Sequence, residues 1–158
     1  MSQTRLLLTC GLPGAGKTTV ATRLARERGA VRLSKDEWLW ALDSSPWNRD
    51  VGAKIEWQLW RLAQELLGLG QSVVVDFGLW ARVERDEMRT VARELGVGVE
   101  LHYLDADTDE LWRRIDERNS SPNWTDDPIT RADLEEWRAV FQAPDAAELA
   151  LFDPPPTG

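Results

Sequence analysis

The stretch GLPGAGKT at residues 11–18 constrains the fold of this chain more than any other feature. It follows the short apolar run 5–10 and leads into helical periodicity over 17–29, so it joins a buried strand to a helix. Glycines in such a turn accept positive φ and let the backbone approach a phosphate, while the N–H groups of the following helix point at the anion. The pattern therefore predicts a loop that holds the phosphates of a nucleoside triphosphate.

The side chains of this loop have separate expected tasks. Lys17 suits the β- and γ-phosphates, and the Thr18 hydroxyl suits Mg²⁺, which keeps its other positions for water and phosphate. A turn that merely needs glycines would give no reason for the lysine and the threonine. The residues expected to bind nucleotide here are Gly11, Leu12, Pro13, Gly14, Ala15, Gly16, Lys17, Thr18 and Thr19.

Runs typical of strands and helices alternate along the rest of the chain. The predicted strands are 5–10, 30–34, 72–78 and 97–105, and the predicted helices are 17–29, 35–43, 49–70, 82–96, 108–119 and 130–142. This alternation predicts an α/β fold with a mostly parallel sheet and helices on both faces. Without repeats or an internal linker, we expect one domain over 1–152 and a frayed tail over 153–158.

The net charge and the cysteine content limit the kinds of binding partner and cellular environment that we expect for this chain. The net charge of -8 argues against an extended nucleic-acid surface. Cys10 is the only cysteine, so the chain has no intramolecular disulfide. The N-terminal apolar run is too short for a membrane span and lacks the layout of a signal peptide. We therefore expect a cytoplasmic protein without a membrane partner, and the sequence leaves its oligomeric state open.

Two carboxylates are expected near the γ-phosphate. Asp36 follows the second predicted strand and Asp76 ends the strand 72–78, and the carboxyl ends of parallel strands share one edge of a sheet. Asp36 in that place can accept the proton of an attacking hydroxyl. Asp76 can hold Mg²⁺ through water or orient the acceptor. The competing interpretations are a helix N-cap for Asp36 and an ordinary strand-end turn for Asp76.

Two arginines are candidates for phosphate contacts. Arg114 and Arg118 lie four residues apart on one face of the predicted helix 108–119. Arginine suits phosphate oxygens and the charge that develops during their transfer. We expect residues from about 115 to 142 to form a lid that brings Arg118 to the site. Salt bridges to acidic neighbours on the same helix are the competing interpretation.

Aromatic residues gather where an acceptor would lie. Trp38, Trp40, Phe77 and Trp80 fall near the strand-end edge, where they could stack on a ring or sugar face, and core packing is the alternative for each. Arg82 is a further acceptor-binding candidate.

Three arginines, Arg82, Arg85 and Arg89, follow one another at helical spacing. They could bind an anionic acceptor, but interleaved acidic residues favour a solvated helix face. His102, the only histidine, is expected to be structural.

The order of the motifs GLPGAGKTT, SKDEW, SVVVDFGLWARVERDEMR and VELHYLDADTDELWRRIDERN resembles that of a known family. It is similar to the small P-loop kinases and ATP-binding proteins related to the polynucleotide kinase domain, with chloramphenicol phosphotransferase and the zeta toxins as more distant relatives. The resemblance runs from about residue 4 to 142. It implies a P-loop NTPase three-layer sandwich with a helical lid, and ATP with Mg²⁺ as cofactors.

The resemblance also implies roles for residues. It makes Asp36 the general base, Asp76 a contact to acceptor or metal, and Arg118, with Arg114 assisting, a contact to the phosphates in transfer. Two positions depart from the polynucleotide kinase pattern. Leu39 replaces an arginine three residues past the base, and Phe77 begins an apolar pair where polar residues are usual. These departures favour a smaller, more apolar acceptor over nucleic acid.

The predicted function is transfer of the γ-phosphate of ATP to a hydroxyl of a small molecule such as an antibiotic, a nucleoside or a sugar-like compound. A polynucleotide 5′-hydroxyl kinase, a zeta-type nucleotide-sugar kinase, and a non-catalytic ATP-binding module or simple ATPase stay open. A switch GTPase is disfavoured because the chain lacks a late N-K-x-D motif. An oligomeric AAA or ABC ATPase would need more sequence. A nucleoside monophosphate kinase usually carries more arginines than residues 35–70 contain.

Overall fold

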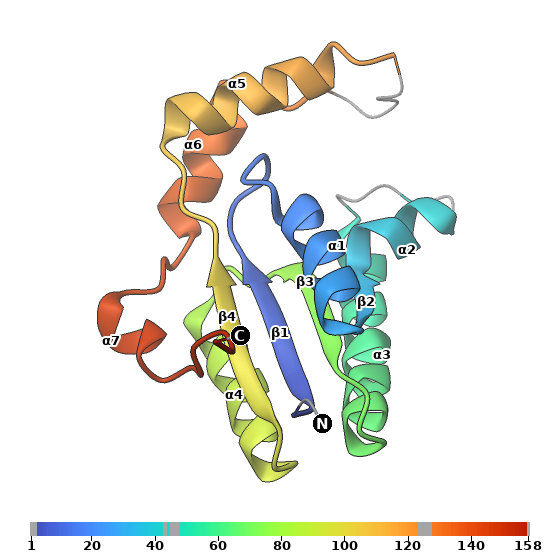
Figure 1. Ribbon diagram of the computed structural model, residues 1–158. Coiled ribbons are helices and arrows are strands. Elements are labelled where there is room, and N and C mark those ends of the chain that lie inside the picture. Colours follow the sequence, from blue (N-terminus) through green and yellow to red (C-terminus); the bar gives the residue numbers. More distant parts are fainter. Residues whose placement is uncertain (1–2, 43, 45–47, 123–127, 158) are drawn as a thin grey trace.

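A four-stranded parallel sheet forms the centre of the protein (Figure 1). The computed structural model describes residues 3–42, 44, 48–122 and 128–157. The strands are β1 (Arg5–Cys10), β2 (Val31–Ser34), β3 (Val73–Gly78) and β4 (Gly98–Tyr103), in the spatial order β2-β3-β1-β4. Every neighbouring pair is parallel, so the predicted α/β class with a parallel sheet is confirmed.

Helices connect the strands, as the alternating pattern predicts. They are α1 (Lys17–Arg28), α2 (Lys35–Ala41), α3 (Arg49–Gly68), α4 (Arg82–Glu94), α5 (Thr108–Asn119), α6 (Arg131–Val140) and α7 (Ala146–Leu149). The six predicted helices are present, and their ends differ from the predicted ends by up to two residues. The last residue of the predicted helix 35–43, residue 43, lies outside the described residues. The sequence analysis missed α7, because a four-residue turn of helix carries no periodic signal.

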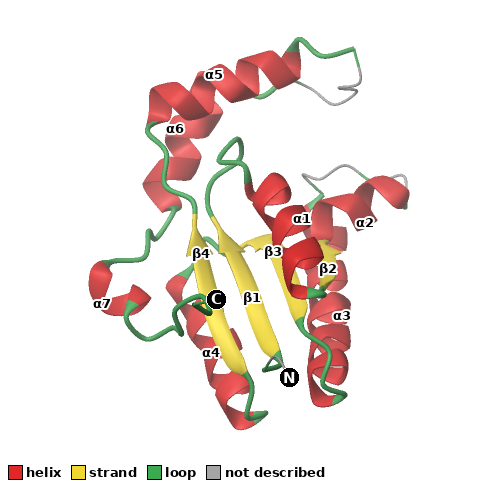
Figure 2. Ribbon diagram, viewed as in Figure 1, coloured by secondary structure: helices red, strands yellow, loops and turns green. Residues whose placement is uncertain are grey.

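The helices form one layer on each face of the sheet (Figure 2). Helix α1 packs on the face to which Leu7 and Val74 point. Helices α3 and α4 pack on the opposite face, where Leu6 and Leu8 belong to the largest hydrophobic cluster. Successive residues of a strand point to opposite faces, so the continuous apolar run of β1 serves both layers. The predicted three-layer arrangement is therefore present.

The strand register places the carboxyl ends of the strands at one edge of the sheet. Ser34 pairs with Asp76 and Cys10 pairs with Gly78. The glycine loop leaves this edge after β1, and α2 begins there directly after β2. Residues that are distant in sequence therefore meet at this edge.

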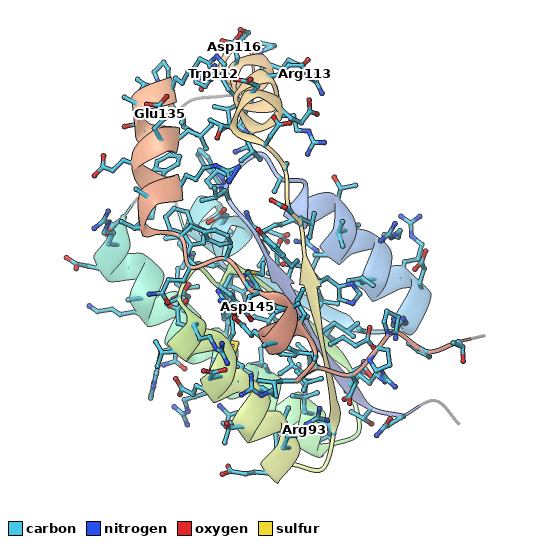
Figure 3. The ribbon with its side chains drawn as sticks, turned by 90° about the vertical axis from the view of Figure 1, so that its left-hand side faces the viewer. Arg93, Trp112, Arg113, Asp116, Glu135 and Asp145 are labelled. Atoms are coloured by element: carbon cyan, nitrogen blue, oxygen red, sulfur yellow. The ribbon has the colours of Figure 1, made fainter. Side chains whose placement is uncertain are left out.

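Helices α5 and α6 lie above this edge (Figure 1). They pack on the glycine loop through a cluster of buried residues, namely Leu12, Ala15, Leu111, Ile115, Ile129 and Leu134. The outer side of α5 carries Arg113 and Asp116, which point away from the sheet (Figure 3). No helix in the described part of the chain is long and apolar enough to span a membrane.

The C-terminal segment covers the open edge of β4. The N–H of Asp153 donates to Val99 O at 2.8 Å, and Asp153 Oδ2 accepts from Val99 N and Arg93 Nη1, each at 2.8 Å. The carbonyl of Pro154 accepts from Arg5 at 2.8 Å. The expectation of a frayed tail from residue 153 is therefore corrected for Asp153 and Pro154. The reason is that β4 is an edge strand whose backbone groups need partners.

Candidate active site

The glycine loop and the start of α1 form a turn whose backbone geometry is suited to an anion. Gly14 and Gly16 have φ values of 86° and 94°, which favour glycine because a side chain there is strained. Gly16 is the N-cap residue of α1, and no described side chain caps this helix end. The first N–H groups of α1 are therefore available to a phosphate.

Lys17 sits between the loop and the two predicted carboxylates. Its Nζ donates to Leu12 O at 3.0 Å. Burial lowers the pKa of Lys17, and the charges of Asp76 and Asp36 oppose that shift. The amine therefore lies close enough to both aspartates to feel their charge, as the sequence pattern predicts.

Asp76 lies buried at the end of β3, next to Thr18. Its Oδ1 accepts from Thr9 Oγ1 at 2.9 Å, and its Oδ2 accepts from Thr18 Oγ1 at 3.5 Å. A hydroxyl beside a carboxylate fits Mg²⁺, which takes oxygen ligands and commonly uses one or two from the protein while phosphates and waters supply the rest. The described residues contain no group of three or more His, Cys, Asp or Glu that could hold a metal by themselves. The pair of Thr18 and Asp76 is therefore compatible with a metal that is bound together with nucleotide.

Asp36 lies in the first turn of α2 and faces the same space. The N-cap of α2 is Ser34, whose Oγ accepts from Glu37 N at 3.4 Å, so the competing interpretation of Asp36 as an N-cap is wrong. Partial removal from water raises the pKa of Asp36, and the cations Lys35 and Lys17 oppose the shift. A carboxylate with a raised pKa is a better proton acceptor than an ordinary aspartate.

The two arginines of α5 reach different places. Arg114 Nη1 donates to Gly14 O at 3.0 Å, and its Nε pairs with Glu110 at 2.9 Å. Arg118 lies near enough to Lys17 and Asp36 to influence the pKa of each. Arg114 therefore contacts the loop itself, whereas the charge of Arg118 acts on the predicted base.

These groups line one cleft with a volume of about 1010 Å³. Its floor is the glycine loop and the end of β3, and its walls come from α2, α3, the start of α4, α5 and α6. This volume is at the upper end of the range for small-molecule sites, roughly 300–1,000 Å³. Of the residues predicted to bind nucleotide, Pro13, Gly14, Gly16, Lys17, Thr18, Thr19 and Arg114 line the cleft, whereas Gly11, Leu12 and Ala15 are buried beneath it.

The predicted acceptor-binding residues divide into two groups. Phe77 and Trp80 line the cleft, and so does Trp40. Trp38 is 46% exposed and is absent from the cleft lining. Arg82 is also absent from that lining; its Nε pairs with Asp86 at 3.3 Å. Trp40 lines the cleft and Trp38 does not, because the burial of Leu39 determines which face of α2 packs on the core.

The sequence analysis missed several polar residues of the cleft. Glu56, Glu84 and Asp133 line it, as does Arg49. From the sequence, Lys35 would be expected at the solvated surface, but its Nζ pairs with Glu56 at 3.0 Å. No sequence signal joins these residues, since they come from four different helices that only the fold brings together.

A comparison with protein-family profiles matches residues 6–144 to the AAA domain. The chain belongs to this family. The match covers a single AAA domain, and the family name specifies no acceptor. A comparison with curated proteins found no significant match.

This AAA domain also resembles several solved structures, among them small kinases. A protein from Chloroflexus aurantiacus J-10-fl, described as a "putative kinase", is 27% identical with a TM-score of 0.71 over 91% of this chain and 83% of its own. A chain of the Pnkp1/Rnl/Hen1 RNA repair complex is 22% identical with a TM-score of 0.74 over 89% of this chain; the match covers 44% of that longer chain. A sugar kinase from Janibacter sp. HTCC2649 is 20% identical with a TM-score of 0.64 over 92% of this chain and 82% of its own. The last two likenesses show the fold alone.

Proposed function

We propose that the protein is a P-loop kinase that transfers the γ-phosphate of ATP to a hydroxyl group of a small molecule. One observation carries the proposal: Lys17, Asp36 and Arg118 line one cleft that is large enough for more than nucleotide alone, and they lie close enough together that Arg118 influences the pKa of both Lys17 and Asp36. An ATPase needs the loop and a water, but a carboxylate with a raised pKa facing an open acceptor space suits deprotonation of an alcohol. The likeness to kinases supports this direction.

In the proposed reaction each side chain has one task. Lys17 and the loop N–H groups bind the β- and γ-phosphates, and Thr18 with Asp76 would hold Mg²⁺, which neutralises phosphate charge when bound. Asp36 takes the hydroxyl proton as the acceptor oxygen bonds to the γ-phosphorus and the bond to the β-phosphate oxygen breaks. Arg118 stabilises the charge on the group in transfer. The products are ADP and a phosphate monoester.

The test is ADP formation from MgATP with a panel of hydroxyl acceptors. The panel holds nucleosides, sugars, amino alcohols, antibiotics, nucleotide sugars and 5′-hydroxyl oligonucleotides. The last two represent the zeta-type and polynucleotide kinase alternatives, and the second of these has support in the TM-score of 0.74 to the RNA repair chain. The kinase proposal expects at least one acceptor to stimulate turnover well above the rate without acceptor.

Asp36→Asn is the informative variant and Glu37→Gln is its matched control. Both change a carboxylate to an amide in the first turn of α2, but Glu37 pairs with Arg32 and is absent from the cleft lining. We expect Asp36→Asn to lose acceptor-dependent turnover while it still binds ATP, and Glu37→Gln to keep both. Turnover that is independent of acceptor and unaffected by Asp36→Asn would instead indicate an ATPase or a nucleotide-binding module.

A further inference from the structure

The half of the cleft where the acceptor would bind, which we call the acceptor half, carries charges that indicate which chemical class of acceptor it could bind. This inference rests on the proposed kinase function, which places the acceptor hydroxyl at Asp36. The part of the cleft beyond Asp36 is lined by α2, α3, the start of α4 and α6. The phosphate-binding cations Lys17 and Arg114 lie on the opposite side, at the glycine loop.

Lys35 is surrounded by three carboxylates in this acceptor half. Its Nζ pairs with Glu56 Oε1 at 3.0 Å, and its charge also influences the pKa of Asp36 and of Glu84. Partial removal from water raises the pKa of Glu84, and the nearby charge of Glu56 raises it further. Lys35 therefore interacts with three carboxylates, two of which repel each other; Lys17 and Arg118 also act on Asp36, and Arg85 also acts on Glu84.

Negative charge predominates over the rest of the acceptor half as well. Asp133 of α6 adds a fourth carboxylate to the lining, and the second cation on these helices is Arg49 in the first turn of α3. Arg49 is exposed and lies seven residues before Glu56, which is about two helical turns, or roughly 10 Å, along α3. In the described lining contributed by α2, α3, α4 and α6, four carboxylates thus face two cations, and Arg118 of α5 is a third cation close to Asp36.

Tryptophan rings provide a second, independent attraction for positive charge. Trp40, Trp80 and Trp137 all line the cleft. The Trp80 and Trp137 rings lie 6.2 Å apart between centroids, and Phe141 packs edge-on against Trp80 at 6.4 Å, so the wall is held in place. Indole rings attract cations through their π-electrons and stack on ring systems.

We propose that the acceptor is a cationic, ring-bearing alcohol, with its hydroxyl at Asp36, its ammonium group toward Glu56 and Glu84, and its ring against Trp80 and Trp137. The chemistry is that of the kinase reaction: the alcohol loses its proton to Asp36 and gains the phosphoryl group, and the amine takes no covalent part. Anionic acceptors such as nucleotide sugars and oligonucleotides would meet like charge in this half of the cleft.

The test measures binding with three probes that share a phenyl ring and an alcohol and differ in charge. They are phenylalaninol (cationic), N-acetylphenylalaninol (neutral) and 3-phenyllactate (anionic). The protein carries 5-fluorotryptophan, and each probe is titrated by ¹⁹F NMR in the presence of Mg²⁺ and a non-hydrolysable ATP analogue. We expect the cationic probe to bind at least ten-fold more tightly than the neutral probe, and the anionic probe to bind most weakly. Equal binding of the three, or tightest binding of the anion, would overturn the inference.

Charge variants show which residues provide the selectivity. Glu84→Gln keeps an acceptor for the N–H of Ala81 but removes the charge, and we expect it to reduce the preference for the cationic probe several-fold. Glu87→Gln on the same helix, absent from the cleft lining, is the matched control and should leave the preference unchanged. Arg49→Gln should keep or increase the preference. A preference that depends on Arg49 and not on Glu84 would show that the cleft binds an anion.

The binding and turnover measurements separate the two proposals. Selective binding of the cationic probe without phosphorylation of any acceptor supports the cation site and contradicts the kinase. Acceptor-dependent ADP formation with neutral or anionic alcohols, without a preference for cations, supports the kinase and overturns the inference.

Discussion

Arg85 of α4 and Glu148 of α7 form a two-point ion pair in the protein interior. Nε of Arg85 donates to Glu148 Oε2 at 2.6 Å and Nη2 donates to Oε1 at 2.9 Å, and the two side chains are 0% and 1% exposed. The same guanidinium donates to Leu79 O at 2.8 Å and to Gln142 O at 2.6 Å. Leu79 follows β3 in the cleft and has a strained φ of 51°, while Gln142 follows α6. Arg85 therefore connects the floor of the cleft to the segment that follows α6, and the expectation that it lies on a solvated helix face is wrong.

Arg85→Met is expected to destabilise the protein severely. It leaves the buried Glu148 with only the more distant Arg82, whose Nε lies 3.7 Å from Oε1, and it removes the donors to two carbonyl groups. Breaking such a buried pair typically costs about 3–5 kcal/mol. The measurement is the free energy of unfolding from urea titration. We expect Arg85→Met combined with Glu148→Leu to recover part of the loss, because the buried carboxylate that has lost its two-point partner is then gone.

Arg113→Met is the control for this loss. Arg113 pairs with Glu110 and Glu117 on the outer side of α5 (Figure 3), where its side chain is 58% exposed. Ion pairs of that kind contribute little, so the control should unfold close to the parent. If Arg85→Met were no less stable than Arg113→Met, the ion pair with Glu148 would not be a structural clamp.

Thr9→Val is expected to weaken the binding of Mg²⁺ to the nucleotide complex. Thr9 donates to Asp76 Oδ1 at 2.9 Å and so orients the carboxylate proposed to hold the metal. Loss of such an orienting hydrogen bond typically lowers metal affinity roughly ten-fold or more. The measurement is a Mg²⁺ titration of the complex with a fluorescent ATP analogue, beside the affinity for the analogue without metal.

Thr22→Val provides the comparison for Thr9→Val. Thr22 donates to Thr18 O within α1 at 2.8 Å and is exposed, so the same change there should leave the Mg²⁺ affinity unchanged. Equal Mg²⁺ affinity for Thr9→Val and the parent protein would argue against Asp76 as the metal-binding carboxylate.

The parts of the site that the sequence predicts are those set by local pattern or by parallel-strand geometry. The loop around Lys17 is encoded in consecutive residues, and Asp36 and Asp76 follow adjacent parallel strands, so their meeting could be inferred. The acceptor wall could not be predicted, since Glu56 and Glu84 belong to different helices whose rotation is set by packing. The burial of Arg85 depends on a partner from a helix of one turn.

Truncation after Phe152 is expected to destabilise the protein, whereas truncation after Pro154 is expected to be neutral. The shorter chain loses the hydrogen bonds of Asp153 to Val99 and Arg93, and it leaves the edge of β4 open. Asp153 makes four such hydrogen bonds, which at roughly 0.5–1.5 kcal/mol each correspond to roughly 2–6 kcal/mol. Thermal unfolding of the two truncated proteins measures the difference. Equal stability would mean that the hydrogen bonds of Asp153 contribute little to the stability of the fold.

Asp36 is expected to reduce the stability of the protein at neutral pH. Partial removal from water raises its pKa in the folded state, so the folded protein binds this proton more tightly than the unfolded chain does. The favourable contribution of such a group is complete below the unfolded pKa, about 3.9, and is lost as the pH rises through the folded pKa. Asp36→Asn, which stays neutral, should therefore be more stable than the parent at pH 7, and the difference should vanish near pH 3.5.

The same raised pKa predicts how activity depends on pH. Acceptor-dependent turnover requires the ionised form of Asp36, so the rate should fall as the pH decreases through the raised pKa, above the range of an ordinary aspartate. Thermal unfolding of the parent, Asp36→Asn and Glu37→Gln at pH 7 and pH 3.5, beside a pH–rate profile of the parent, tests both consequences. Glu37→Gln should lack the gain at pH 7, because Glu37 pairs with Arg32 outside the cleft. If Asp36→Asn were less stable than the parent at pH 7, the carboxylate of Asp36 would stabilise the fold. The assignment of Asp36 as a catalytic base whose ionised form destabilises the protein would then be wrong.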